Sequence, residues 1–250
     1  MEKSRGGVSA GALKALAVLA MTLDHLAWAF VPRLSLLGMA MHLVGRITAP
    51  VMCFFLAEGF AHTRSVKKYV LRLGAFALAS QVPYALFCSG DPFYGFLNMM
   101  YTLFLCLLAL WAWESGLPKP LRLLAVFLLT AATMAGDWAV YAMLFTFAFY
   151  LHRGDAQAQA RALSAAAGVL ALMTAAGYAG SIPPGDVLRA ALPELGVLLS
   201  LPLLARYRGE RGRGGAAAKW FFYFYYPAHL LVIWFLKAGS LGAGEAYALL

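Results

Sequence analysis

Three ionisable side chains interrupt an apolar run near the start of the chain, LKALAVLAMTLDHLAWAF at residues 13–30. Lys14 and His25 are eleven residues apart. On an α-helix this spacing puts both on one face, roughly 16 Å apart along the axis. A neutral histidine can accept a proton from a hydroxyl or an amine. The run therefore predicts acid–base chemistry at His25, and Asp24, which points about 100° away from it, needs a partner on another helix.

A second apolar run reads MHLVGRITAPVMCFFLAEGFAHTRS and carries two pairs of ionisable residues. His42 and Arg46 are one helical turn apart, at the expected depth of the first site. Glu58 and His62 are also one turn apart, nearer the other end. Pro50 is expected to kink or break the helix between the two pairs. We predict that Arg46 stabilises developing negative charge or holds a substrate, and that Glu58 belongs with Asp24 to the catalytic group.

Basic residues gather after this second run and at the matching end of the first, where they can bind an anionic ligand from the cytosol. The candidates for that ligand are Lys14, His62, Arg64, Lys67, Lys68 and Arg72. Other polar residues fall from the expected membrane midplane outwards, where a second substrate would be contacted. These acceptor-side candidates are His42, Asn98, Asp137, Tyr226 and His229. The two groups together predict a polar path across the bilayer.

The amino-acid composition indicates the class of fold that must position these residues. Of 250 residues, 62% are hydrophobic and 12% are charged, so lipid must solvate much of the chain. The apolar runs do not alternate with polar residues, which argues against a β-barrel. We predict an all-α, polytopic membrane helical bundle that forms a single domain over residues 1–250, with about nine spans. The runs are 11–31, 36–61, 69–88, 96–113, 121–135, 138–151, 162–180, 187–205 and 219–237.

Two points of this topology follow from the short runs and the basic residues. The runs at 121–135 and 138–151 fit either two tilted helices or one re-entrant pair. With a cytoplasmic N-terminus, only Arg33, Arg189 and Lys237 fall outside. The cytoplasmic set is Lys3, Arg5, Arg64, Lys67, Lys68, Lys119, Arg122, Arg153, Arg161, Arg206, Arg208, Arg211, Arg213 and Lys219. This asymmetry predicts a multi-pass protein of a bacterial cytoplasmic membrane with its C-terminus outside.

Several partner classes are not expected. The net charge of +9 does not indicate nucleic-acid binding, because the basic residues cluster in short segments between apolar runs. His25, His42 and His229 stand on three separate runs, without the spacing of a metal site. We therefore expect a lipid bilayer around the chain, but neither a nucleic-acid partner nor a bound metal.

Blocks along the chain resemble the TraX family of membrane proteins, whose namesake is implicated in N-terminal acetylation of conjugative pilin. The blocks are AVLAMTLDHLAW, GRITAPVMCFFLAEGFAHTRSVKKYVLRL, SQVPY, LNMMYTL, GDW and FFYFYYPAHLLVIW. They run from the first predicted span to the last, so the resemblance covers most of the chain.

The chain is also similar to a wider family of membrane acyltransferases that modify cell-surface polysaccharides. That family has a basic residue, ten intervening residues and a histidine in its first span, a pattern that Lys14 and His25 match. It also has a block similar to FFLAEGFAHTRS, usually with serine at the position of Glu58. The resemblance implies that His25 is catalytic and that Lys14 contacts coenzyme A, which enters from the cytoplasm.

We therefore expect an acetyl-CoA-dependent acyltransferase with acetyl-CoA as co-substrate and His25 as general base. The acetyl group would cross the bilayer to an extracytoplasmic acceptor, either a pilin N-terminal amine or a surface glycan hydroxyl. Two alternatives stay open. One is a transporter or flippase that uses an intramembrane relay of Asp, His and Glu side chains. The other is a scaffold for a surface appendage whose buried charges only hold the helices together.

Overall fold

A computed structural model gives the fold of residues 7–210 and 215–245, and in the last helix it describes the side chains of residues 220–240. Part of the basic set behind the orientation prediction lies outside the described residues: Lys3, Arg5, Arg211, Arg213 and, for its side chain, Lys219.

Every regular element among the described residues is a helix, so the predicted all-α class is confirmed. The first half of the chain forms α1 (Ala10–Phe30), α2 (Leu36–Gly45), α3 (Thr48–His62), α4 (Val66–Ala79), α5 (Gln81–Ser89) and α6 (Met99–Trp113). The second half forms α7 (Lys119–Ala132), η1 (Thr133–Ala135), α8 (Ala139–Leu151), α9 (Ala156–Tyr178), α10 (Pro184–Ala191), η2 (Leu192–Leu199), α11 (Ser200–Ala205) and α12 (Gly215–Glu245). Each predicted apolar run thus contains at least one helix.

The second apolar run is interrupted, as predicted, but the break lies before the proline. α2 ends at Gly45 and α3 begins at Thr48, so Arg46 stands at the break. Pro50 falls in the first turn of α3, where its missing backbone N–H has no intrahelical partner to lose. The break therefore places a charged residue at a helix end inside an apolar run.

Within the part of the chain that the structure describes, length and composition make five stretches of helix candidates for crossing a membrane: Ala10–Phe30, Leu36–His62, Val66–Ser89, Ala156–Tyr178 and Pro184–Ala205. Two shorter apolar helices are Met99–Trp113 and Ala139–Leu151. All of them coincide with predicted runs. The count of nine spans and the orientation of the termini remain predictions.

The chain contains two compact units, each built from two separate stretches of sequence. Unit 1 consists of the described residues within 1–52 and 152–222, and unit 2 of those within 53–151 and 223–250. The expected single domain over residues 1–250 remains a prediction.

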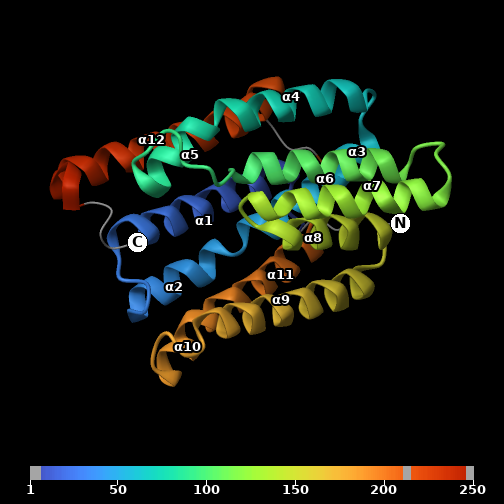
Figure 1. Cartoon of the computed structure of the whole chain (residues 1–250). Coiled ribbons are helices and arrows are strands. Elements are labelled where there is room, and N and C mark those ends of the chain that lie inside the picture. The colour runs from blue at the N-terminus through green and yellow to red at the C-terminus, as the bar shows by residue number, and fades with distance from the viewer. Residues whose placement is uncertain (1–6, 211–214, 246–250) are drawn as a thin grey trace. The chain divides into compact units, whose positions relative to one another are not determined.

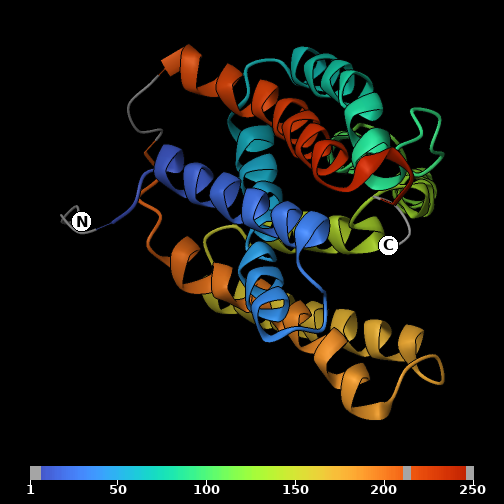
Figure 2. The same cartoon turned by 90° about the vertical axis from the view of Figure 1, so that its left-hand side faces the viewer.

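In unit 1, α1 packs against α2, α2 against η2, and η2 against α9. Figures 1 and 2 both show α9 running alongside the segment formed by α10, η2 and α11. η2 comes so close to α2 that a Cβ added at Gly196 would collide with the backbone of Leu43. This close approach brings residues from the two sequence stretches of unit 1 into one polar site.

In unit 2, α6 packs against α4, α7 and α8. α12 lies along α4, where the ring centroid of Phe76 is 4.9 Å from that of Tyr223 and 5.1 Å from that of Phe224. Both views show these two helices side by side (Figures 1 and 2). Aromatic contacts thus hold the C-terminal helix against α4.

Candidate functional site

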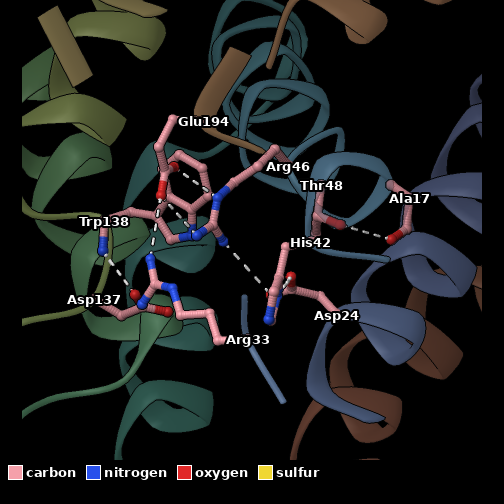
Figure 3. Close-up of polar contacts among 9 residues, drawn as sticks. All are labelled: Ala17, Asp24, Arg33, His42, Arg46, Thr48, Asp137, Trp138 and Glu194. Carbon is pink, nitrogen blue, oxygen red and sulfur yellow. Dashed lines mark hydrogen bonds and ion pairs between the residues drawn. The ribbon is translucent and has the colours of Figure 1, made fainter. Parts of the chain in front are cut away.

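A carboxylate and an imidazole from α1 and α2 form a buried pair in unit 1 (Figure 3). The Nδ1–H of His42 donates to Oδ1 of Asp24 at 2.8 Å. Because a neutral imidazole carries one proton, this bond makes Nε2 the basic nitrogen of the ring. His42 is 2% exposed, and its Nε2 has no hydrogen-bond partner among the described residues. A carboxylate that holds an imidazole in one tautomer is the arrangement of a general base.

Arg46 connects this pair to a second carboxylate, that of Glu194 in η2 (Figure 3). Its Nε donates to Oε2 of Glu194 at 2.7 Å and its Nη2 donates to Oε1 at 3.0 Å, a bidentate ion pair. Its Nη1 lies 3.6 Å from Oδ2 of Asp24. Arg46 is 9% exposed and Glu194 is 4% exposed. Since an unpaired buried charge is strongly destabilising, the guanidinium and the two carboxylates stabilise one another.

Local sequence explains why α1 and α2 approach so closely here. A Cβ added at Gly45 would collide with the side chain of Asp24, so only glycine leaves room for that carboxylate. Beyond the break, the Thr48 hydroxyl donates to the carbonyl oxygen of Ala17 at 3.0 Å. The prediction that Asp24 takes its partner from another helix is therefore confirmed.

Arg33 adds a second guanidinium beside Glu194. Its Nη2 lies 3.9 Å from Oε1 of Glu194, and its side chain is 27% exposed. The guanidinium carbon is 4.8 Å from the ring centroid of Trp28 and 5.3 Å from that of Tyr178. Arg33 thus connects the buried network to the surface of unit 1.

Neither Glu194 nor Arg33 is among the predicted site residues. The charge pattern marks Arg33 only as a cation outside the membrane. Glu194 is the single acidic residue of the predicted run 187–205, and an acid in such a run is itself a signal of a functional or paired site. That signal could have found it.

Lys14 and His25, the two residues predicted to share one face of α1, have different surroundings. His25 is half-buried and lies within electrostatic range of Asp24 and Arg46. Lys14 is half-buried further back on α1, with its Nζ 6.0 Å from the ring centroid of Phe222. His25 therefore lies close enough to the network to be affected by its charges, while the predicted roles of His25 and Lys14 toward an acyl donor stay predictions.

The remaining predicted residues belong to unit 2. Oε2 of Glu58 is 3.6 Å from Nε2 of His62, whose side chain is 62% exposed. The other candidates for binding an anionic ligand are exposed except for the last, which is half-buried: Arg64, Lys67, Lys68 and Arg72. The structure brings Glu58 and His62 together, as their spacing predicts.

The acceptor-side candidate Asn98 is a helix cap. Its Oδ1 accepts from the backbone N–H of Met100 at 3.0 Å and of Tyr101 at 3.2 Å. Its Nδ2 donates to the Ala77 carbonyl at 2.8 Å and to Oε1 of Gln81 at 2.7 Å. All the hydrogen bonds that an amide of this kind can readily make are used, so the geometry gives Asn98 a structural role.

The other acceptor-side candidates in unit 2 also bond to the backbone. The Tyr226 hydroxyl accepts from the N–H of Met99 at 3.2 Å. Nδ1 of His229 lies 2.9 Å from the carbonyl oxygen of Tyr225 and donates to it. Oδ1 of Asp137 accepts from the N–H of Trp138 at 2.9 Å. Among the described residues, no group of three or more His, Cys, Asp or Glu side chains is arranged to hold a metal ion.

The helices and the network define a class: an all-helical protein with candidate membrane spans and a buried network of charged side chains between helices. The chain belongs to the TraX family, whose model, described as TraX protein, matches residues 9–237. It is 36% identical over 236 residues to the probable fimbrial assembly protein FimC, serogroup H1, of Dichelobacter nodosus, covering 90% of this chain and 94% of that protein. No solved structure matches the chain significantly.

Proposed function

We propose that the protein is a membrane acetyltransferase, which moves an acetyl group from cytosolic acetyl-CoA to an acceptor on the outer side of a bacterial cytoplasmic membrane. The observation that carries this proposal is the buried Asp24–His42 pair, held by Arg46 and adjacent to His25. This buried network fixes charged groups next to His25, and a neutral imidazole is suited to removing a proton from a weak nucleophile.

The reaction needs one proton transfer and one acyl transfer. The acceptor, an amine or a hydroxyl, attacks the thioester carbonyl while an imidazole takes its proton. The carbon–sulfur bond then breaks, and the departing thiolate of coenzyme A takes up that proton. In this proposal Arg46, whose guanidinium is held by Glu194, stabilises the negative charge that develops on the carbonyl oxygen.

Two histidines are available for the proton transfer. We assign it to His25, because its spacing from Lys14 resembles the pattern in which the wider family of membrane acyltransferases has its catalytic histidine. His42 then holds Asp24 and Arg46 in register at the site. Lys14, His62 and the exposed cations after α3 are the proposed contacts for the anionic donor.

The family and the relative support an acceptor that belongs to a surface fibre. The relative is called a probable fimbrial assembly protein. We therefore favour a pilin N-terminal amine over a surface glycan hydroxyl as the acceptor. The acceptor is the protein's proposed partner on the outer side of the membrane.

The test is acetyl transfer by purified protein reconstituted in vesicles with acetyl-CoA and pilin, with His25→Ala, His42→Ala and Asp24→Asn as variants. We expect His25→Ala to reduce the rate by about a hundredfold to ten-thousandfold, the range of a lost general base. His152→Ala is the control, because His152 is exposed and lies outside the site. If His25→Ala keeps full activity and His42→Ala loses it, His42 is the general base. If both variants keep full activity, the proposed mechanism is contradicted.

One observation favours the transporter as a second candidate. Helices are broken within apolar runs at Arg46 and at Ser80, and discontinuous helices are common at the binding sites of transporters. Binding of acetyl-CoA to the purified protein separates the candidates, because a transporter of another solute has no reason to bind it. An acetyltransferase must bind it without the acceptor being present.

A further inference from the structure

Arg72, on α4 in unit 2, has its guanidinium beside two tyrosine rings. The guanidinium carbon is 5.1 Å from the ring centroid of Tyr69 and 5.5 Å from that of Tyr223. Tyr69 is one turn away on α4, and Tyr223 comes from α12, the helix that lies along α4 in Figures 1 and 2. Nε of Arg72 donates to the hydroxyl of Tyr223 at 3.2 Å. The rings and this bond hold the guanidinium in a defined orientation.

Arg72 is half-buried, yet it forms no ion pair with any described residue. Arg46, which is more deeply buried, does form one with Glu194, and so does Arg189 with Asp186. Half-buried charges are normally paired, because removing them from water is costly. Arg72 therefore holds a positive charge that an anion from outside the chain can balance.

The donors that remain on Arg72 specify the anion. With Nε bonded to Tyr223, the two Nη groups form a fork, and this fork matches pairs of oxygens on a phosphate. A phosphate monoester presents three terminal oxygens and a charge of about −1.5 to −2. Lys68 lies one turn before Arg72 on the same helix and is exposed, so a second cation is near the same face.

We propose that Arg72, oriented by Tyr69 and Tyr223, binds the 3′-phosphate of coenzyme A. This site rests on the proposed function, which supplies coenzyme A as the donor and the cytoplasmic side as its entry. It assigns Tyr69 and Tyr223 a binding role, and it separates Arg72 from the exposed cations around it, which attract the donor without orienting it.

The experiment measures equilibrium binding of coenzyme A and of 3′-dephospho-coenzyme A to the full-length protein in detergent, by calorimetry. Arg72→Gln is expected to weaken binding of coenzyme A by about tenfold to a hundredfold, the effect of losing charge-assisted hydrogen bonds. The same variant should bind 3′-dephospho-coenzyme A nearly as well as the unmodified protein does. Tyr223→Phe, which keeps the ring and removes the hydroxyl, should show a smaller loss confined to coenzyme A.

Arg161→Gln is the matched control, because Arg161 is exposed on α9 and its replacement removes one positive charge at a cytoplasmic position of the predicted topology. It should leave the binding of both ligands unchanged. Arg72→Lys keeps the charge but not the fork, and should recover only part of the affinity. Thermal unfolding of each variant shows whether it is folded.

Equal losses for both ligands in Arg72→Gln, or no loss for either, would overturn the site. The first result would mean that Arg72 only stabilises the contact between α4 and α12, and the second that it faces lipid headgroups or solvent. Absence of coenzyme A binding by the unmodified protein would also overturn it. If Arg72→Gln weakens binding of coenzyme A selectively but the unmodified protein transfers no acetyl group in vesicles, the phosphate site holds and the proposed reaction is contradicted. If the unmodified protein transfers the acetyl group but Arg72→Gln shows no selective loss of binding, the reaction holds and the phosphate site is contradicted.

Discussion

At the scale of residues, the site of unit 1 depends on charges that satisfy one another. Glu194 binds Arg46 through two hydrogen bonds, and Arg46 lies beside Asp24, whose other oxygen holds His42. Each member is buried or nearly so, and removal of one leaves its neighbour with an uncompensated charge. The network is therefore expected to matter for stability as well as for chemistry.

Glu194→Gln should lower the free energy of unfolding by about 3–5 kcal/mol, because Arg46 then remains buried without its bidentate partner. The measurement is chemical or thermal unfolding of the purified protein in detergent. Asp186→Asn removes a carboxylate from the exposed pair with Arg189, and should cost only about 0–1 kcal/mol. Similar costs for the two variants would show that the Arg46–Glu194 pair is not needed for stability.

Asp24→Asn tests the same network through catalysis. The amide can no longer act as the negative partner of His42 and Arg46, so the guanidinium proposed to stabilise the developing charge loses its orientation. We expect acetyl transfer to fall by about a hundredfold or more, as when one donor to a developing oxyanion is lost. The protein should still bind acetyl-CoA, which calorimetry checks. Loss of binding together with turnover would instead indicate that the site has collapsed.

At the scale of elements, two glycines set how closely the helices of unit 1 approach. Gly45 leaves room for the Asp24 side chain, and Gly196 lets η2 reach the backbone of α2 at Leu43. The contacted atoms at Leu43 belong to the backbone and cannot rotate away. The position of Glu194 relative to Arg46 therefore depends on a residue without a side chain.

Gly196→Ala should destabilise the protein by about 1–3 kcal/mol, the usual cost of overpacking, and should lower activity by displacing Glu194. Gly177→Ala is the control, because Gly177 lies on α9 with no atom within 4 Å of an added Cβ. That variant should be as stable as the unmodified protein or more stable, since alanine is the better helix former. Thermal unfolding compares the two, and a stable Gly196→Ala would contradict the close contact.

At the scale of the whole molecule, the positive charges predict how the chain crosses the membrane. The proposal of cytosolic acetyl-CoA and an outer acceptor requires Lys14 and the cations after α3 to face the cytoplasm. It also requires the segment around Arg33 to face outwards. Orientation is thus a condition of the proposed function.

Alkaline phosphatase, which is active only outside the cytoplasm, provides the measurement. Alkaline phosphatase should be active when it is fused after residue 250. It should be inactive when it is inserted after Gly154, in the exposed turn between α8 and α9. The expectation follows from the excess of basic residues in the segments placed inside. Phosphatase activity from the insertion at Gly154 would show that the predicted orientation, or the predicted number of spans before Gly154, is wrong.

The helical class, the position of nearly every helix and the pairing of residues one turn apart could be predicted from the amino-acid sequence. The contact between Glu58 and His62 was predictable because helical periodicity is a local property. The need of Asp24 for a partner on another helix was predictable for the same reason. The break before Pro50 was expected within a few residues, since proline disturbs the helix on its N-terminal side.

Which residues meet could not be predicted in this way, because it depends on the tertiary structure. Asp24 pairs with His42, and Arg46 pairs with Glu194, a residue 148 positions away. Asn98 caps α6, and the prediction that it contacts a substrate stays a prediction. Local patterns specify the face on which a side chain lies, but its partner depends on how closely and at what angle helices distant in sequence pack. In unit 1 that packing is set by the space left at Gly45 and Gly196.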